Sequence, residues 1–200
     1  MTRMAGYAAI RDAIDSIAAL LRAHITDSGE AGLSGTPVRV NTPREVELAN
    51  VANAVAVWLH HVTVQPDRVN AAPPRPAPGR ELRRPVPVEL AVCVVPINGD
   101  GATAHLLLGR VFQVLADHAR LAGGALSGSL AASGATLTIA LDPLGSYETN
   151  LLWAGQQTHQ RPGVAVRISG VTIDSHLDAL ASAPVLHATA PLAQIVGVGP

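Results

Sequence analysis

Residues 83–121 are the stretch that most constrains the fold of this chain. The apolar positions alternate from Val86 to Leu90 and then run without interruption from Ala91 to Val95. That change predicts a long strand that begins at an edge of the protein and ends buried between two layers. The sequence Asn98-Gly99-Asp100-Gly101 that follows predicts a turn.

An amphipathic helix is predicted directly after this turn, capped by Asp100 or Thr103. Apolar and weakly polar side chains recur at three- and four-residue spacing and form one stripe: Leu107, Val111, Val114, Leu115, His118 and Leu121. A helix with such a stripe must lie across the sheet to bury it. The strand, the turn and the helix therefore predict the centre of a scaffold.

The first third of the chain predicts one helix, at 4–24, followed by extended segments. The expected buried face of this helix consists of Tyr7, Ile10, Ile14, Ile17 and Leu21, and its expected polar positions are Arg11, Asp12, Asp15 and Arg22. Residues 38–40 predict a short extended segment, and Thr42-Pro43 predicts the start of a short helix. Residues 51–65, rich in β-branched side chains, predict a long strand.

The last third predicts two more strands and a short helix. Residues 122–134 are expected to form a loop, and 135–141 alternate as a strand does. Ser146 is expected to cap a helix that ends at Gly155. A strand at 164–173 changes phase near its end, which predicts a bulge at Ser169-Gly170.

Together these elements predict a single α/β or α+β domain over residues 1–175. Its sheet is expected to be mixed, mainly antiparallel and flanked by helices. A chain of 200 residues with 48% hydrophobic content can bury one full core. Residues 176–200 are expected to form an arm or a last strand at 194–198, because 179–200 carry no Asp, Glu, Lys or Arg.

No constellation in the sequence predicts catalysis, a metal or a cofactor. His60 and His61 are expected to point to opposite faces of one strand, which prevents joint ligation. The chain contains no lysine and therefore no phosphate-binding loop of the Walker type. Ser127-Gly128-Ser129 lacks the strand-turn-helix context of a catalytic serine. Cys93, the single cysteine, is expected to be a buried, inert thiol.

Charge and hydropathy also argue against nucleic-acid and membrane partners. The net charge is −1, so broad attraction to nucleic acid or an anionic membrane is not expected. Charged residues interrupt the N-terminal helix, which argues against a signal peptide, and no uncharged apolar run predicts a membrane span. The proline-rich loop at 66–84 carries several arginines and is long enough to serve a contact.

The order of several short motifs resembles a known family. These motifs are Arg68-x-Asn70, Arg84-Pro85, Leu108-Gly109, Trp153 and Arg161-Pro162. Across residues 5–175 they resemble the N-terminal domain of cap proteins of contractile injection systems, the phage-tail-like particles of the Photorhabdus virulence cassette and antifeeding prophage type. The chain departs from the family pattern at two places: the family often has an aromatic residue near Cys93 and a tyrosine near Ala165, and this chain has small residues at both places.

The resemblance implies a tail terminator. Such a protein forms a hexameric ring that ends the inner tube and the contractile sheath at the end distal to the baseplate. It implies sheath and tube proteins as partners, no enzymatic activity and no cofactor, and assembly in the cytoplasm, with release of the particle left open. We expect the partner interface to include Arg68, Asn70, Arg75, Arg80, Arg83, Arg84, Ile195 and Val196.

Two other interpretations stay open at this stage. A tail-terminator or tail-completion protein of a contractile phage fits the same pattern, with a head connector as an additional neighbour. A small-molecule-binding protein or an enzyme without a recognisable motif belongs to a different class, as does a plain adaptor domain. A stable monomer in solution would favour the second class or the adaptor.

Overall fold

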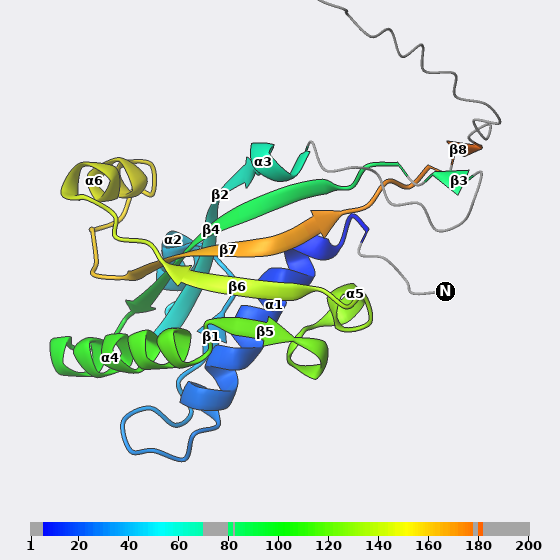
Figure 1. Cartoon of the computed structure of the whole chain (residues 1–200). Coiled ribbons are helices and arrows are strands. Elements are labelled where there is room, and N and C mark those ends of the chain that lie inside the picture. The colour runs from blue at the N-terminus through cyan, green and yellow to red at the C-terminus, as the bar shows by residue number, and fades with distance from the viewer. Residues whose placement is uncertain (1–5, 70–79, 82, 178–179, 182–200) are drawn as a thin grey trace, which may run out of the picture.

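A six-stranded sheet forms the body of the protein (Figure 1). The computed structural model describes residues 6–69, 80–81, 83–177 and 180–181. The sheet order is β1-β2-β4-β7-β6-β5, with β1 parallel to β2 and every other pair antiparallel. The strands are β1 (Val38–Arg39), β2 (Ala54–Val64), β4 (Val86–Ile97), β5 (Arg120–Ala122), β6 (Thr136–Leu141) and β7 (Val164–Ile173). The predicted mixed, mainly antiparallel sheet is confirmed.

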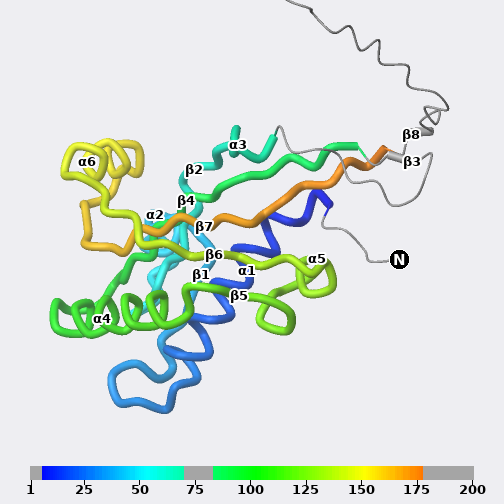
Figure 2. Tube along the Cα trace, viewed as in Figure 1, coloured from blue at the N-terminus to red at the C-terminus, as the bar shows by residue number. Residues whose placement is uncertain are grey.

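Helices pack on both faces of this sheet, as the Cα trace shows (Figure 2). They are α1 (Ala9–Leu21), which continues as a π-helical turn (Arg22–Thr26), α2 (Pro43–Leu48), α3 (Pro66–Val69), α4 (Gly101–Asp117), α5 (Gly128–Ala131) and α6 (Ser146–Ala154). A 3₁₀ turn, Gly123–Ala125, precedes α5. A separate two-stranded sheet pairs β3 (Arg80–Glu81) with β8 (Leu180–Ala181).

Strand β4 is buried on both faces, as its sequence predicts. Its residues Leu90, Val92 and Val94 belong to the main core, which α1, α4 and α5 close. Cys93 and Val95 belong to a second, smaller core on the opposite face, together with side chains from α2 and α6. The first residue, Val86, is exposed.

The turn after β4 leads into α4 as predicted, with Asp100 as the cap. The Asp100 carboxylate accepts a hydrogen bond from the Thr103 backbone N–H at 2.7 Å. The helix ends at Asp117, so Leu121 lies in β5 and not on the helix stripe. The 3₁₀ turn and α5 occupy seven of the thirteen residues of the segment 122–134 that is expected to be a loop, so this expectation is wrong. Both elements are too short to leave a periodic pattern in the sequence.

Helix α1 has the predicted face, with two exceptions. Tyr7 precedes the helix and is 96% exposed, so it does not belong to the buried face. Asp12, expected on the polar side, is only 2% exposed. Its buried carboxylate accepts hydrogen bonds from the backbone N–H and the hydroxyl of Ser129, in another element, and the local sequence pattern does not reveal this partner.

The remaining local predictions differ from the structure in details. The short helix α2 has the predicted cap at Thr42, and the Glu45 carboxylate completes it. Helix α6 is capped at Gly145, whose N–H donates to Glu148, and not at Ser146. The loop expected at 66–84 holds one turn of helix, α3, and the short strand β3. The last strand expected at 194–198 lies outside the described residues.

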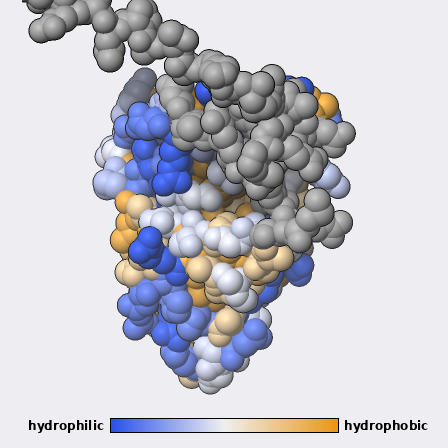
Figure 3. Space-filling view, turned by 45° about the vertical axis from the view of Figure 1, so that its right-hand side comes forward, coloured by the Kyte–Doolittle hydropathy of each residue, from blue (hydrophilic) through white to orange (hydrophobic). Residues whose placement is uncertain are grey.

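The surface carries scattered apolar side chains. Figure 3 shows hydrophobic patches interleaved with hydrophilic ones on the face turned to the viewer. The large exposed hydrophobic residues include Leu106 and Phe112 of α4, Leu141 of β6, and Tyr147 and Leu151 of α6. Among the described residues, none of the helices has the length and apolar character needed to cross a membrane.

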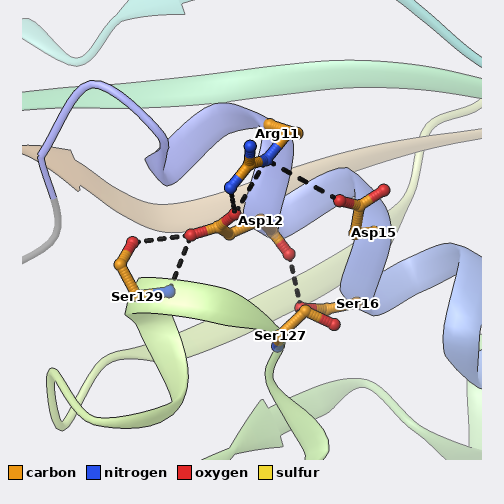
Figure 4. A network of polar contacts seen from close by, with 6 residues as sticks. All are labelled: Arg11, Asp12, Asp15, Ser16, Ser127 and Ser129. Atoms are coloured by element: carbon orange, nitrogen blue, oxygen red, sulfur yellow. Dashed lines mark hydrogen bonds and ion pairs between the residues drawn. The ribbon is translucent and has the colours of Figure 1, made fainter.

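A buried polar joint attaches α1 to α5 (Figure 4). The Asp12 carboxylate accepts hydrogen bonds from the backbone N–H and the hydroxyl of Ser129, at 2.7 and 2.6 Å. Arg11 donates to the other carboxylate oxygen at 2.9 Å. The Ser16 hydroxyl accepts from the Ser127 N–H at 2.8 Å. The two serines of the Ser127-Gly128-Ser129 motif therefore hold two elements together.

Electrostatics favour the charged form of Asp12. Burial acts to raise the pKa of its carboxyl, but the hydrogen bonds from Ser129 and the contacts with Arg11 outweigh burial and hold that pKa below its ordinary value. Between the two serines, Gly128 has φ +56°, and a Cβ on it would lie 2.4 Å from the Asp12 carboxylate. The hydrogen-bonded contact between α1 and α5 therefore requires both Asp12 and Gly128.

The predicted bulge in β7 is confirmed. Ser169 and Gly170 together oppose Glu89 of β4, because Ile168 pairs with Leu90 and Val171 with Val88. Gly170 has φ +92°, and a Cβ on it would lie 2.1 Å from the Thr136 carbonyl oxygen. This glycine allows β6 and β7 to approach each other where the strand changes phase.

We expect Gly170→Ala to destabilise the protein by about 1–3 kcal/mol or more, because both the positive φ and the contact with Thr136 oppose a side chain. Urea unfolding monitored by circular dichroism measures this. Gly109→Ala is the matched control: the position lies in α4 with open space where a Cβ would be added, so the substitution should stabilise by up to about 1 kcal/mol. Equal effects of the two changes would contradict the interpretation of the bulge.

We expect Asp12→Asn to lower the free energy of unfolding at neutral pH by about 1–3 kcal/mol, since a Ser129 donor loses its charged acceptor. The folded-state pKa of Asp12 is depressed, so its stabilisation is complete above the unfolded pKa of about 4 and is lost as the pH falls through the folded pKa. The difference between wild type and variant should therefore shrink on acidification. Denaturant unfolding as a function of pH measures both effects. Asp15→Asn, at a more exposed site, should change stability by less than about 0.5 kcal/mol.

Candidate functional site

The arginines predicted at the partner interface lie at one end of the β2–β4 hairpin. Arg68, Arg83 and Arg84 are all exposed. The two chain segments that carry them are adjacent, because the Gln65 N–H donates to the Pro87 carbonyl at 2.9 Å. The chain segments that carry these arginines thus leave the sheet at the same end of the hairpin.

Other predicted interface residues fall outside what the structure describes. Asn70, Arg75, Ile195 and Val196 lie outside the described residues. For Arg80 the structure gives only the backbone, which belongs to β3.

A groove between α4, α6 and the ends of β6 and β7 is a second candidate surface. Its volume is about 620 Å³, and the side chains around it are mainly apolar. Phe112 from α4, Leu141 from β6 and Trp153 from α6 line it. Five of the 200 residues are aromatic by the counts of Phe, Trp and Tyr, and two of these five line this groove. We call it the α4–α6 groove.

Two small residues also line the α4–α6 groove. Cys93 and Ala165 are partners across β4 and β7, and both line the groove. Burial raises the pKa of the Cys93 thiol to about 11, so the thiol stays protonated and unreactive near neutral pH. The burial predicted for Cys93 is confirmed.

The two charged residues of the groove are already paired. Arg161 donates to Glu47 of α2 at 3.0 Å, and Asp142 accepts from Arg167 of β7 at 3.0 Å. Glu47 also accepts from the Thr158 hydroxyl; the hydrogen bonds from Thr158 and then Arg161 lower the pKa of its carboxyl below the ordinary value. The groove therefore offers mainly apolar surface in which both charged groups have an ion-pair partner, although the buried Nε of Arg161 has no hydrogen-bond partner among the described residues.

A second hollow, of about 730 Å³, lies between α6 and the outer face of the sheet. His60 and His61 both line it, together with Glu89 and Arg167. The expectation that the two histidines point to opposite faces is wrong, because β2 has an irregularity between Leu59 and His61 that shifts the register. Burial, followed by the proximity of His61, lowers the pKa of His60.

This second hollow does not form a metal centre. Among the residues that the structure describes, no group of three or more His, Cys, Asp or Glu side chains is placed to hold a metal ion. Arg167 instead bridges Asp142 and Glu89, at 3.0 and 3.5 Å. These groups join strands β4 and β7 to the loop that follows β6.

The α4–α6 groove could not be found from the sequence for a clear reason. Its lining residues come from five separate elements and loops, at positions as distant as 93, 112, 141, 153 and 165. The exposure of Phe112 and Leu141 is the signal that marks the site, and it requires the fold to be known. The arginine cluster, in contrast, is visible in the sequence because its members flank one loop.

Comparison with solved structures shows a shared fold. One similar structure is the sheath/tube terminator of an extracellular contractile injection system, PVC, in the extended state. The TM-score is 0.66 and the sequence identity is 16%, and the match covers 95% of this chain and 65% of that chain. The second is the cap of the anti-feeding prophage, described as the AFP tube terminating cap, with TM-score 0.64 and 14% identity over 91% of this chain and 61% of that chain. The chain thus spans less than two thirds of the length of either structure.

The family comparison agrees with the resemblance found from the motifs. No curated protein sequence matches this chain significantly. Residues 12–187, in contrast, match the family model described as the Pvc16 N-terminal domain, and this range contains the whole six-stranded sheet. The chain therefore belongs to the Pvc16 N-terminal domain family.

Proposed function

We propose that this chain is a structural cap of a contractile injection system. Six copies form a ring that ends the inner tube and the contractile sheath at the end distal to the baseplate. Family membership over residues 12–187 is the observation that carries the proposal. The fold shared with a sheath/tube terminator and with a tube terminating cap supports it.

A structural and non-enzymatic role agrees with the use of the polar groups. Asp12 joins α1 to α5, and Glu47 joins α2 to the loop before β7. Arg167 joins neighbouring parts of the sheet. These buried or half-buried charges hold elements of the domain together, as a ring subunit that bears load requires.

The partners in this proposal are further copies of the chain, the sheath protein and the inner tube protein. The exposed cluster of Arg68, Arg83 and Arg84 supplies a cationic contact to one of them. The ring assembles in the cytoplasm on a completed tube and sheath and is part of any particle that is released. Residues 1–175 form the cap domain, and 176–200 form an arm.

The mass of the purified protein tests the ring. Light scattering behind size exclusion is measured on the protein alone and after mixing with its sheath and tube proteins. We expect either a discrete hexamer or a monomer that appears with six-fold symmetry on particle ends in electron micrographs. A stable monomer that binds neither protein would overturn the proposal.

Charge reversal tests the arginine cluster. The double variant Arg83→Glu, Arg84→Glu should weaken binding to sheath or tube by about tenfold, because exposed ion pairs each contribute about 0.2–1 kcal/mol and reversal adds repulsion. The matched control is the double variant Arg39→Glu, Arg120→Glu, which makes the same change in net charge at exposed arginines on β1 and β5, the two edge strands of the sheet. Co-sedimentation with assembled sheath and tube measures the difference. Equal weakening by both variants would exclude a specific contact at the hairpin end.

A further inference from the structure

The α4–α6 groove has the properties of a socket for an apolar segment. Phe112 and Leu141 are each 47% exposed at its rim. The small side chains of Cys93 and Ala165, which pair across β4 and β7, also line it. Exposed apolar side chains next to a hollow favour a covered interface, because burying them removes apolar area from water.

The charge state of the groove selects an uncharged occupant. Arg161 and Asp142 are engaged by Glu47 and Arg167. A charged segment placed here would lose its hydration against mainly apolar side chains, and the ion pairs of Arg161 and Asp142 leave it only the Arg161 Nε as a donor without a partner among the described residues. An aliphatic segment without charges would lose nothing of that kind.

This chain itself contains such a segment, after the last described strand. Residues 182–200 include no Asp, Glu, Lys or Arg and carry Val185, Leu186, Leu192, Ile195, Val196 and Val198. The last described residue, Ala181, pairs with Arg80 in the small β3–β8 sheet. Nineteen residues follow it, since 200 − 181 = 19, and they can span up to about 60 Å when extended.

The groove and the start of this segment lie at opposite ends of β7. The groove includes Val164 and Ala165, the first residues of the strand. The chain passes Ile173, the last residue of β7, before it reaches β8 on the far side of the molecule (Figure 1). A ten-residue strand is about 30 Å long. Donor and acceptor on opposite sides of one subunit are the arrangement from which head-to-tail contacts close into rings.

We propose that residues 185–198 of one copy occupy the α4–α6 groove of the next copy. The contact is heterologous: each subunit offers its groove to one neighbour and its aliphatic segment to the other. The ring-forming role rests on the proposed function, whereas the contact itself does not require a tube or a sheath.

Site-directed cross-linking between two differently tagged full-length chains tests the contact. One chain carries Leu141→Cys at the groove rim, and the other carries Val196→Cys in the segment. The two chains are co-expressed and treated with a short bismaleimide, a reagent in which each of the two maleimide groups reacts with one cysteine thiol. The reaction is carried out on the two chains alone and again in the presence of sheath and tube proteins. Val40→Cys, with 40% exposure near β1, replaces Leu141→Cys in the control pair. The wild-type chain, whose Cys93 thiol is buried, serves as the blank.

We expect an adduct that carries both tags and forms at least fivefold more with Leu141→Cys than with Val40→Cys. Adding Phe112→Asp to the groove chain should reduce this adduct at least fivefold, while the urea unfolding midpoint stays close to that of the parent. No adduct, or equal adducts at positions 141 and 40, would overturn the proposal. A further variant carries both Leu141→Cys and Val196→Cys in one chain. If a cross-link forms only within this single chain and never between two chains, the proposal is overturned, because the segment would then occupy the groove of its own subunit.

The outcomes separate this inference from the proposed function. Six-fold caps on particle ends without a two-tag adduct would leave the cap role intact and remove the groove contact. A two-tag adduct in a protein that binds neither sheath nor tube would establish the contact and contradict the cap role.

Discussion

The burial of β4 on both faces is the constraint on which the rest of the structure depends. A strand with Val92 and Val94 on one side and Cys93 and Val95 on the other must be covered by two layers. Helices α1 and α4 supply one layer, and α2 with α6 supplies the other. Strands β2 and β7 satisfy its backbone on either side. The helices and strands around β4 are therefore positioned by the need to cover its two faces and to pair with its two edges.

Local sequence periodicity predicted the elements whose own residues show a strand or helix pattern. It missed the features that depend on contacts with residues far away in the sequence. The strand at β4, the capped helix after it and the bulge at Gly170 follow from neighbouring residues alone. The burial of Asp12 does not, because its hydrogen-bond partner Ser129 lies 117 residues away. Strand β5 is also set by pairing with β6 and has only three residues.

The same distinction applies to the candidate surfaces. The arginines that flank the proline-rich loop can be recognised in the sequence, and the hairpin places the two chain segments that carry them side by side. The α4–α6 groove was invisible, since it arises where helix α6 stands over small residues on β4 and β7. Its apolar rim and its internally paired charges become meaningful only in three dimensions. Family likeness led to the proposed role of the molecule without predicting this surface.

The pairing of β4 with β7 has a consequence for how the chain is made. Val94 pairs with Val164, which the ribosome adds 70 residues later, since 164 − 94 = 70. Translation adds about 5–20 residues per second, so the edge of β4 that pairs with β7 stays unpaired for about 4–14 seconds. During that time only the hairpin with β2 shields it. The nascent chain thus presents an unpaired hydrophobic edge, and chaperone binding during translation is expected to protect it.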